Sequence, residues 1–278
     1  MLGYVRLATF NVLHGRPMRD GGQGDFPSDP AQPLADAVAA LDADVLALQE
    51  LDRHQDRTGK VDQALVAAQA MGATDWRFAT AVTAAVTAAV TAGNGVRVYS
   101  AREAGGGEPA FGIALLTRRP VVDWRVKRLA PAPAALPMPM PVVGRPGLVV
   151  HHDHPRVVLA AVLEGRRGPF TVAATHLSFV PPWNAAELTA IRRWLGGLPR
   201  PHLVLGDLNL PGPVPRLVLG PGWRDLVRAP TYPAHRPRLQ IDHVLAAGLT
   251  PAAVRGASGA APVIPVSDHR PLLVELDL

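Results

Sequence analysis

A carboxylate and a carboxamide follow one apolar run in the segment Leu203-Val204-Leu205-Gly206-Asp207-Leu208-Asn209. Side chains two residues apart in extended backbone point to the same side, so Asp207 and Asn209 can be aimed at one point. An ionised aspartate can accept a proton from water or bind a hard cation, and an asparagine amide can donate to a phosphoryl oxygen. The simpler interpretation is a loop in which both side chains cap backbone groups.

Other apolar runs also end in, or carry, groups suited to a cation or a phosphate. These groups are Asn11, Glu50, His176, Asp242, and Asp268 with His269. One acid at the end of a strand is usually a cap or a surface residue, but a buried charge is costly unless it is paired or bound to a metal. The number of such placements therefore predicts one shared polar site.

Several neighbouring residues could extend this site. Arg53 and Arg57 follow Glu50 and could hold a substrate phosphate, although a solvated loop would have the same composition. His14 lies three residues after Asn11 and could line the pocket. The segment from His151 to His154 has the composition of a metal cluster but lacks helical ligand spacing, so we interpret it as a surface turn.

The elements that must position these side chains are mostly strands. Alternating or continuous apolar residues predict strands at residues 5–10, 44–50, 111–117, 156–164, 170–175, 202–206, 239–245 and 271–278. Helical spacing predicts helices at residues 34–41, 61–71 and 183–195, the last with Asn184 as a candidate cap. Strands that outnumber helices, several of them wholly apolar, indicate an α/β sandwich with covered sheets.

Turns and prolines mark two further segments. Residues 120–129 predict a partner strand for residues 111–117, because a tight turn at Arg118-Arg119-Pro120 separates the two. Residues 130–146 contain six prolines and predict an irregular loop or a sheet edge. This segment is too short to separate two domains, so we expect one domain over residues 1–278.

Composition limits the function further. The 278 residues are 48% hydrophobic and include no cysteine, which excludes disulfides and thiolate metal sites and suits a reducing compartment. The N-terminus lacks the pattern of a signal peptide and no run of about 18 uncharged apolar residues occurs, so we expect a cytoplasmic protein without a membrane span. The net charge is +5, and only two of the 28 basic residues are lysine. This balance favours a polyanionic partner, unless it only reflects a bias in composition; the sequence does not specify an oligomeric state.

The polar segments resemble, in kind and order, the motifs of the endonuclease/exonuclease/phosphatase superfamily of Mg²⁺-dependent phosphoesterases. The matching segments are Thr9-Phe10-Asn11, Leu48-Gln49-Glu50, Thr175-His176-Leu177, Gly206-Asp207-Leu208-Asn209, Ile241-Asp242-His243 and Ser267-Asp268-His269-Arg270-Pro271. The resemblance spans nearly the whole chain. It implies a four-layer α/β/β/α sandwich of two facing β-sheets flanked by helices.

The resemblance also implies a role for each matching residue. Glu50 and Asp268 would bind Mg²⁺, or Mn²⁺ in its place, and Asn11 would help to orient the metal site. Asp207 would activate the attacking water. Asn209, His176 and His269 would hold phosphoryl oxygens, with Asp242 orienting His269.

The sequence therefore predicts a metal-dependent phosphoesterase, and its charge makes a nuclease acting on DNA or RNA the leading class. One alternative is a phosphatase or phosphodiesterase that acts on a phospholipid headgroup or a small phosphate ester. Another is a binding module without catalysis, but Glu50, Asp207 and His269 are all present.

Overall fold

Two six-stranded sheets form the centre of the computed structural model, which describes residues 4–19, 22–83, 107–133, 136–142, 145–151 and 153–278. The strands of the first sheet are β1 (Tyr4–Asn11), β4 (Val45–Arg53), β5 (Asp75–Thr83), β6 (Ala110–Thr117), β15 (Ser258–Ala260) and β16 (Leu272–Asp277). The strands of the second are β7 (Val121–Leu129), β10 (Arg156–Leu163), β11 (Phe170–His176), β12 (His202–Asp207), β13 (Trp223–Asp225) and β14 (Asp242–Ala247). The first sheet has the order β15-β16-β1-β4-β6-β5, and the second has the order β13-β14-β12-β11-β10-β7.

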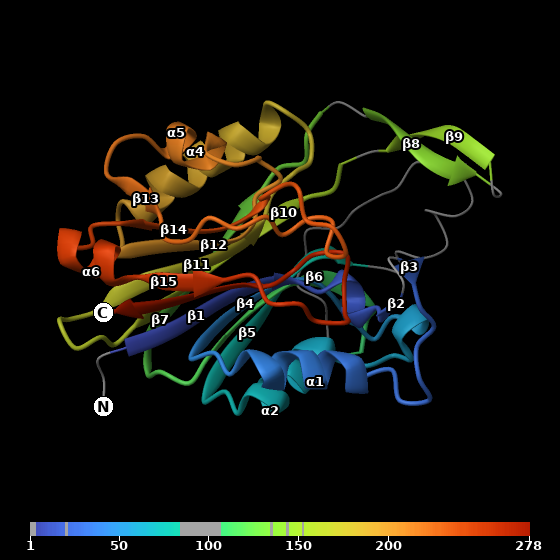
Figure 1. The fold of residues 1–278 in the computed structure, drawn as a ribbon, viewed down its shortest axis with the longest axis horizontal. Helices are drawn as coiled ribbons and strands as arrows, with labels where there is room; N and C mark the ends of the chain where they lie inside the picture. The colour runs from blue at the N-terminus through green and yellow to red at the C-terminus, as the bar shows by residue number, and fades with distance from the viewer. Residues whose placement is uncertain (1–3, 20–21, 84–106, 134–135, 143–144, 152) are drawn as a thin grey trace.

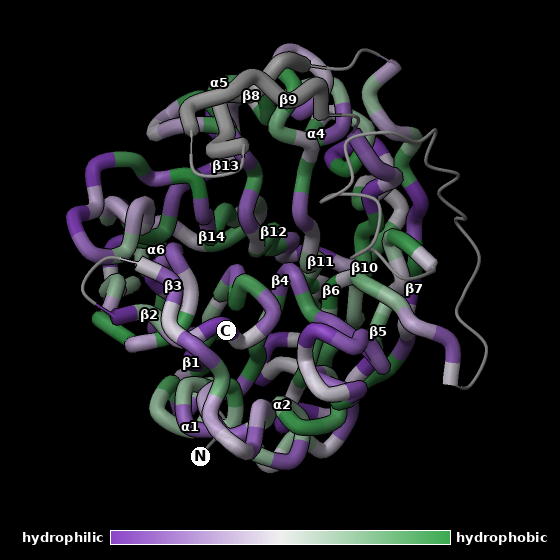
Figure 2. Tube along the Cα trace, turned by 90° about the vertical axis from the view of Figure 1, so that its right-hand side faces the viewer, coloured by the Kyte–Doolittle hydropathy of each residue, from purple (hydrophilic) through white to green (hydrophobic). Residues whose placement is uncertain are grey.

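Helices cover the outer face of each sheet (Figure 1). The helices are α1 (Gln32–Leu41), α2 (Gln63–Met71), α4 (Trp183–Leu195), α5 (Val214–Leu219) and the short α6 (Pro251–Gly256). α1 and α2 pack on the first sheet, and α4 and α5 pack on the second, each through its own apolar cluster. A third cluster fills the space between the sheets. Figure 2 shows the backbone of the two sheets turned by 90° from the view of Figure 1. The expected four-layer sandwich is therefore confirmed.

Local sequence explains where these helices stop and start. The side chain of Asp62 accepts a hydrogen bond from the Leu65 amide at 3.2 Å and caps the start of α2. That helix ends at Gly72, whose φ of +65° is readily adopted only by glycine. Asn184 does not cap α4, contrary to expectation, because the helix begins at Trp183 and Asn184 lies inside its first turn. Within the described ranges, no helix is long and apolar enough to cross a membrane.

The strand register brings the predicted polar residues to one edge of the sandwich. β1 and β4 run parallel, with Asn11 opposite Gln49. β11 and β12 also run parallel, with His176 opposite Asp207. β14 is antiparallel to β12, so its first residue, Asp242, lies opposite Asp207. Carboxyl ends of parallel strands share one edge of a sheet, and β14 contributes its amino end to the same edge.

Two details of the sequence-based assignment are wrong. β7 does not pair with β6 but crosses to the second sheet and pairs with β10. β14 begins at Asp242 rather than at residue 239, so its polar pair lies at the start of the strand. Residues 130–146, expected to be an irregular loop or a sheet edge, contain β8 (Leu136–Val142) and the start of β9 (Arg145–His151), which pair as a separate two-stranded sheet whose strands are both edges. The prolines of β8 fall on alternate residues, and in an antiparallel pair alternate residues need not donate to the partner strand.

Candidate active site

Glu50 lies in a bulge of β4. Leu48 pairs with Ala114 and Leu51 pairs with Gly112, so the two residues Gln49 and Glu50 lie opposite a single position of β6. Glu50 has a φ of +59°, in the left-handed region that a glutamate rarely adopts. Such bulges redirect a side chain and are common beside active sites. The bulge thus turns a strand residue toward the edge where the other strands end.

Asn11 joins Glu50 to Asp207 across the two sheets. Its side-chain nitrogen donates to Glu50 Oε1 at 2.9 Å and to Asp207 Oδ2 at 3.1 Å. Its side-chain oxygen accepts a hydrogen bond from the Leu13 amide at 3.1 Å, which fixes the amide orientation. One buried carboxamide therefore sets the positions of two carboxylates from different sheets.

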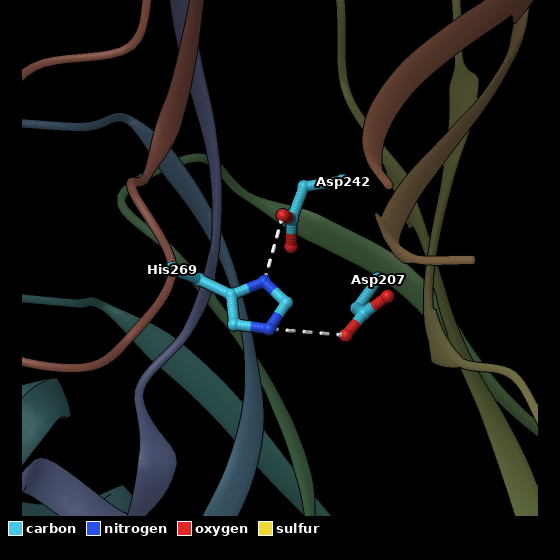
Figure 3. Close-up of side chains that lie close together, drawn as sticks. All are labelled: Asp207, Asp242 and His269. Atoms are coloured by element: carbon cyan, nitrogen blue, oxygen red, sulfur yellow. Dashed lines mark hydrogen bonds and ion pairs between the residues drawn. The ribbon is translucent and has the colours of Figure 1, made fainter. Parts of the chain in front are cut away.

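His269 lies between the carboxylates of Asp242 and Asp207 (Figure 3). Its Nδ1 is 2.8 Å from Asp242 Oδ2, and its Nε2 is 3.8 Å from Asp207 Oδ2. All three residues are buried. Their ligand atoms lie within 4.8 Å of one another, so these side chains could also hold a metal ion. The close Asp242–His269 pair, however, has the geometry of a carboxylate that orients an imidazolium.

Burial and neighbouring charge shift the pKa values of this cluster in different directions. Burial raises the pKa of Asp207 to about 7, and the charge of Asp242 adds to the effect. Burial opposes protonation of His269, but the charges of Asp242, Asp207 and Asp268 outweigh it and raise the His269 pKa to about 10. The cluster can therefore combine a carboxylate that titrates near neutral pH with a cationic histidine.

His176 and Asn209 complete the second side of the cluster. Nε2 of His176 lies 3.5 Å from Asp207 Oδ2 and 3.4 Å from the side-chain nitrogen of Asn209. Burial lowers the pKa of His176 well below its usual value, and the positive charge of Arg156 lowers it further. Asn209 has a φ of +50° and donates to the Leu177 carbonyl at 3.0 Å. His176 is thus a neutral histidine beside Asp207, in contrast to His269.

Glu50 and Asp268 supply oxygen atoms suited to a hard cation. Burial raises the pKa of Glu50; the Asn11 amide and the charge of His269 oppose this, and the charge of Asp268 raises the pKa further. A cation between Glu50 and Asp268 would offset the repulsion between their carboxylates, and Mg²⁺ prefers carboxylate oxygen. The donor set therefore fits a divalent ion.

Of the three residues expected to extend the site, Arg53 and Arg57 have other partners, and the buried Nδ1 of His14 has none among the described residues. Arg53 donates to Asp62 at 2.8 Å, and Arg57 forms two hydrogen bonds, of 2.7 and 2.6 Å, with the buried Asp52. Burial lowers the pKa of His14 to about 3, with the charges of Arg57 and Arg16 adding to the effect. Among the described residues, no hydrogen bond or ion pair joins these three side chains to the Asp207 cluster. Their contact with a substrate stays a prediction.

The residues from His151 to His154 do not behave as a surface turn throughout. Asp153 is buried and forms an ion pair with Arg156 at 2.9 Å. The ring of His154 packs edge-on against Phe111, with 5.9 Å between the ring centres. His152 lies outside the described residues.

Sequence reasoning missed three supporting residues. Thr231 donates its hydroxyl to Asp242 Oδ2 at 2.5 Å. Asn184 donates to the Asn209 carbonyl at 3.0 Å, and the charge of the buried Arg156 lowers the His176 pKa. Each occurs in a segment whose local pattern is that of a loop, a helix or a strand, so only the tertiary fold marks it.

Known proteins share both the sequence pattern and the fold. Residues 8–269 match the sequence model of the Endonuclease/Exonuclease/phosphatase family. A structure of an endonuclease/exonuclease/phosphatase from Bacteroides vulgatus has a TM-score of 0.61 and 17% identity, covering 99% of each chain. Truncated TDP2 from Caenorhabditis elegans has a TM-score of 0.58 and 13% identity, covering 100% of each chain.

A mannosyl-6-phosphatase from Bacteroides thetaiotaomicron has a TM-score of 0.57 and 15% identity, and the similarity covers 98% of this chain and 99% of that one. At these identities the likeness concerns the fold. No curated protein matches the chain.

Proposed function

Because the chain belongs to the endonuclease/exonuclease/phosphatase family, we propose that it hydrolyses phosphate esters with the help of a divalent cation, Mg²⁺ or Mn²⁺. The observation that carries this proposal is the hydrogen-bonded chain from Glu50 through Asn11 to Asp207, beside the Asp242–His269 pair. It combines oxygen ligands for a cation, a base for water and a cationic donor for phosphate within one buried cluster.

Each residue of the cluster has a part in the proposed reaction. Glu50 and Asp268 would hold the cation, with Asn11 orienting Glu50. Bound there, the cation would withdraw electron density from the phosphoryl group. Asp207 takes a proton from the attacking water, which suits a carboxyl whose pKa is about 7.

The remaining groups stabilise charge on the phosphoryl oxygens as it grows during in-line attack. His269 donates from Nε2, while Asp242 holds the proton on Nδ1. His176 and the side-chain amide of Asn209, whose nitrogens lie 3.4 Å apart, would donate from the other side. No cysteine is present in the chain to act as a thiolate nucleophile, and water serves in that role.

The favoured substrate is nucleic acid, because the chain carries a net charge of +5 that comes almost entirely from arginine. The test is a panel of substrates with Mg²⁺: duplex DNA, single-stranded DNA, RNA, sphingomyelin, inositol phosphates and a chromogenic diester. Preferred turnover of a nucleic acid supports the proposal. Preferred turnover of a lipid headgroup or a monoester would assign the site to that alternative substrate, and turnover of none would reject the function.

A further inference from the structure

A loop beside His269, residues Thr231–Leu239, is closed by backbone hydrogen bonds and carries positive charge that no described residue pairs; we refer to it as the cationic arm. An isolated bridge pairs Tyr232 with Leu239, and backbone bonds of 2.8 to 3.0 Å close the loop at both ends. The Ala234 amide donates to the Asp268 carbonyl at 2.7 Å, and the Arg270 amide donates to the Thr231 carbonyl at 2.8 Å. The arm is therefore fixed to the two residues that flank His269.

Side chains of the arm also contact the active-site cluster. The ring centre of Tyr232 lies 5.0 Å from that of His269. Thr231 donates to Asp242, the partner of His269. A ligand held by the arm would thus lie next to the phosphate held by His269.

The outer part of the arm presents three exposed basic side chains, His235, Arg236 and Arg238. Within the described part of the chain, neither guanidinium group of Arg236 and Arg238 has a hydrogen bond or an ion pair. Arg53 and Arg57, by contrast, are each held by an aspartate. The arm therefore offers two guanidinium groups with all their donors available, on a backbone that is already ordered.

We propose that the cationic arm binds phosphates that flank the reacting one, so that the substrate is a nucleic-acid strand. This inference rests on the proposed function. A monoester has a single phosphate, which His269 and its neighbours would occupy, and it would leave the arm without a ligand. A strand supplies further phosphates on the same backbone, and arginine suits phosphate recognition. An anionic membrane fits less well, because the arm exposes one large apolar side chain, Leu239, whereas interfacial binding needs an apolar face.

The test is equilibrium binding of a fluorescent single-stranded DNA oligonucleotide to full-length Asp207→Asn protein with Mg²⁺, measured by anisotropy over a range of salt. Adding Arg236→Gln and Arg238→Gln should raise Kd at least about tenfold. It should also reduce the slope of log K against log salt by about 1.4, since each lost phosphate contact on a single strand contributes about 0.7. Arg166→Gln with Arg167→Gln is the matched control, because this exposed pair lies in the turn that precedes β11, at the end of the strand away from His176.

Turnover provides a second readout, measured in protein that keeps the native Asp207. The arm variant should lose more activity on the oligonucleotide than on a chromogenic diester, and the loss should fall on KM. The inference would be overturned if the parent protein did not bind the oligonucleotide, or if the arm variant had an unchanged Kd and salt slope. It would also be overturned if the control pair of substitutions had the same effect as the arm pair. An arm variant that loses binding only to anionic lipid vesicles would also overturn it. Failure of the proposed function is distinct: no substrate would be hydrolysed, whatever the binding results.

Discussion

Asp207 faces another carboxylate directly across a pair of strands. Its partner in the register is Asp242, and like charges in opposite positions of an antiparallel pair repel each other. His269 is the cation that lies between them, and the Asn11 amide and the Asn209 backbone amide each donate to one Asp207 oxygen. A carboxylate placed in this way stays buried while its pKa lies near neutral pH.

Replacing Asp207 with asparagine should therefore separate catalysis from folding. The variant keeps the size of the side chain and removes the repulsion with Asp242, so we expect a melting temperature close to that of the parent. The loss of the base should lower kcat by about a hundredfold or more. Steady-state kinetics with thermal melting test this; unchanged turnover in a folded variant would exclude Asp207 as the base.

Asp242 should support catalysis mainly through His269, since the two side chains are 27 positions apart and in direct contact. His269→Ala should lower kcat by roughly 10²–10³, the scale of one lost electrostatic donor. Asp242→Ala should cost somewhat less. The double variant should resemble His269→Ala alone, because groups that act as a unit are not additive. The test is steady-state kinetics of the three variants at saturating Mg²⁺, with circular dichroism as the folding control. If the losses of kcat in the single variants multiply in the double variant, the two residues act independently.

The same pair makes a prediction about pH. The Asp242 carboxylate helps to raise the His269 pKa to about 10, and burial acts in the opposite direction. His269 donates when protonated, so activity should fall as pH rises through its pKa. Removing the carboxylate in Asp242→Asn lowers that pKa, and the falling limb of the pH–rate profile should move to lower pH. If the falling limb stays at the same pH in the variant, Asp242 does not set the pKa of His269.

At the scale of elements, strands must approach closely to place the cluster. Gly206 immediately precedes Asp207, and a Cβ on it would lie 1.9 Å from the Thr175 carbonyl oxygen of β11. Gly206→Ala must therefore push β11 and β12 apart. We expect a loss of about 3 kcal/mol of unfolding free energy, the upper range for overpacking. Gly197→Ala, with no atom within 4 Å of the added carbon, is the control for chemical denaturation; equal stability of the two variants would reject this close contact.

The sequence predicted most of the strands and the edge where they end, because apolar runs and the polar residues that follow them are local patterns. It did not predict the bulge at Glu50, since two residues of β4 oppose one of β6 only after pairing. Nor did it predict that β7 would cross to the second sheet. Both depend on contacts between distant segments, as do the roles of Thr231 and Asn184 in holding Asp242 and Asn209.

At the scale of the whole molecule, the site exists only when the two sheets are packed together. Asn11 and Glu50 come from the first sheet, whereas His176, Asp207 and Asp242 come from the second. A cation that binds the folded site, and not the unfolded chain, should stabilise the folded protein by mass action. Mg²⁺ should therefore raise the melting temperature in proportion to log concentration above Kd, and Glu50→Gln should weaken this response. Calorimetric scans with Mg²⁺ and with matched NaCl distinguish binding from ionic strength; equal responses of parent and variant would remove Glu50 from the metal site.

The most direct test of the account is hydrolysis of a chromogenic phosphodiester before and after removal of divalent ions. After exhaustive chelation we expect turnover to disappear, because no protein group can supply the charge of the ion at Glu50 and Asp268. Added Mg²⁺ or Mn²⁺ should restore it in the parent but far less in Glu50→Gln, which keeps an oxygen for the Asn11 amide. Full turnover in the chelated protein, or equal restoration in the variant, would contradict a metal-dependent phosphoesterase built on Glu50.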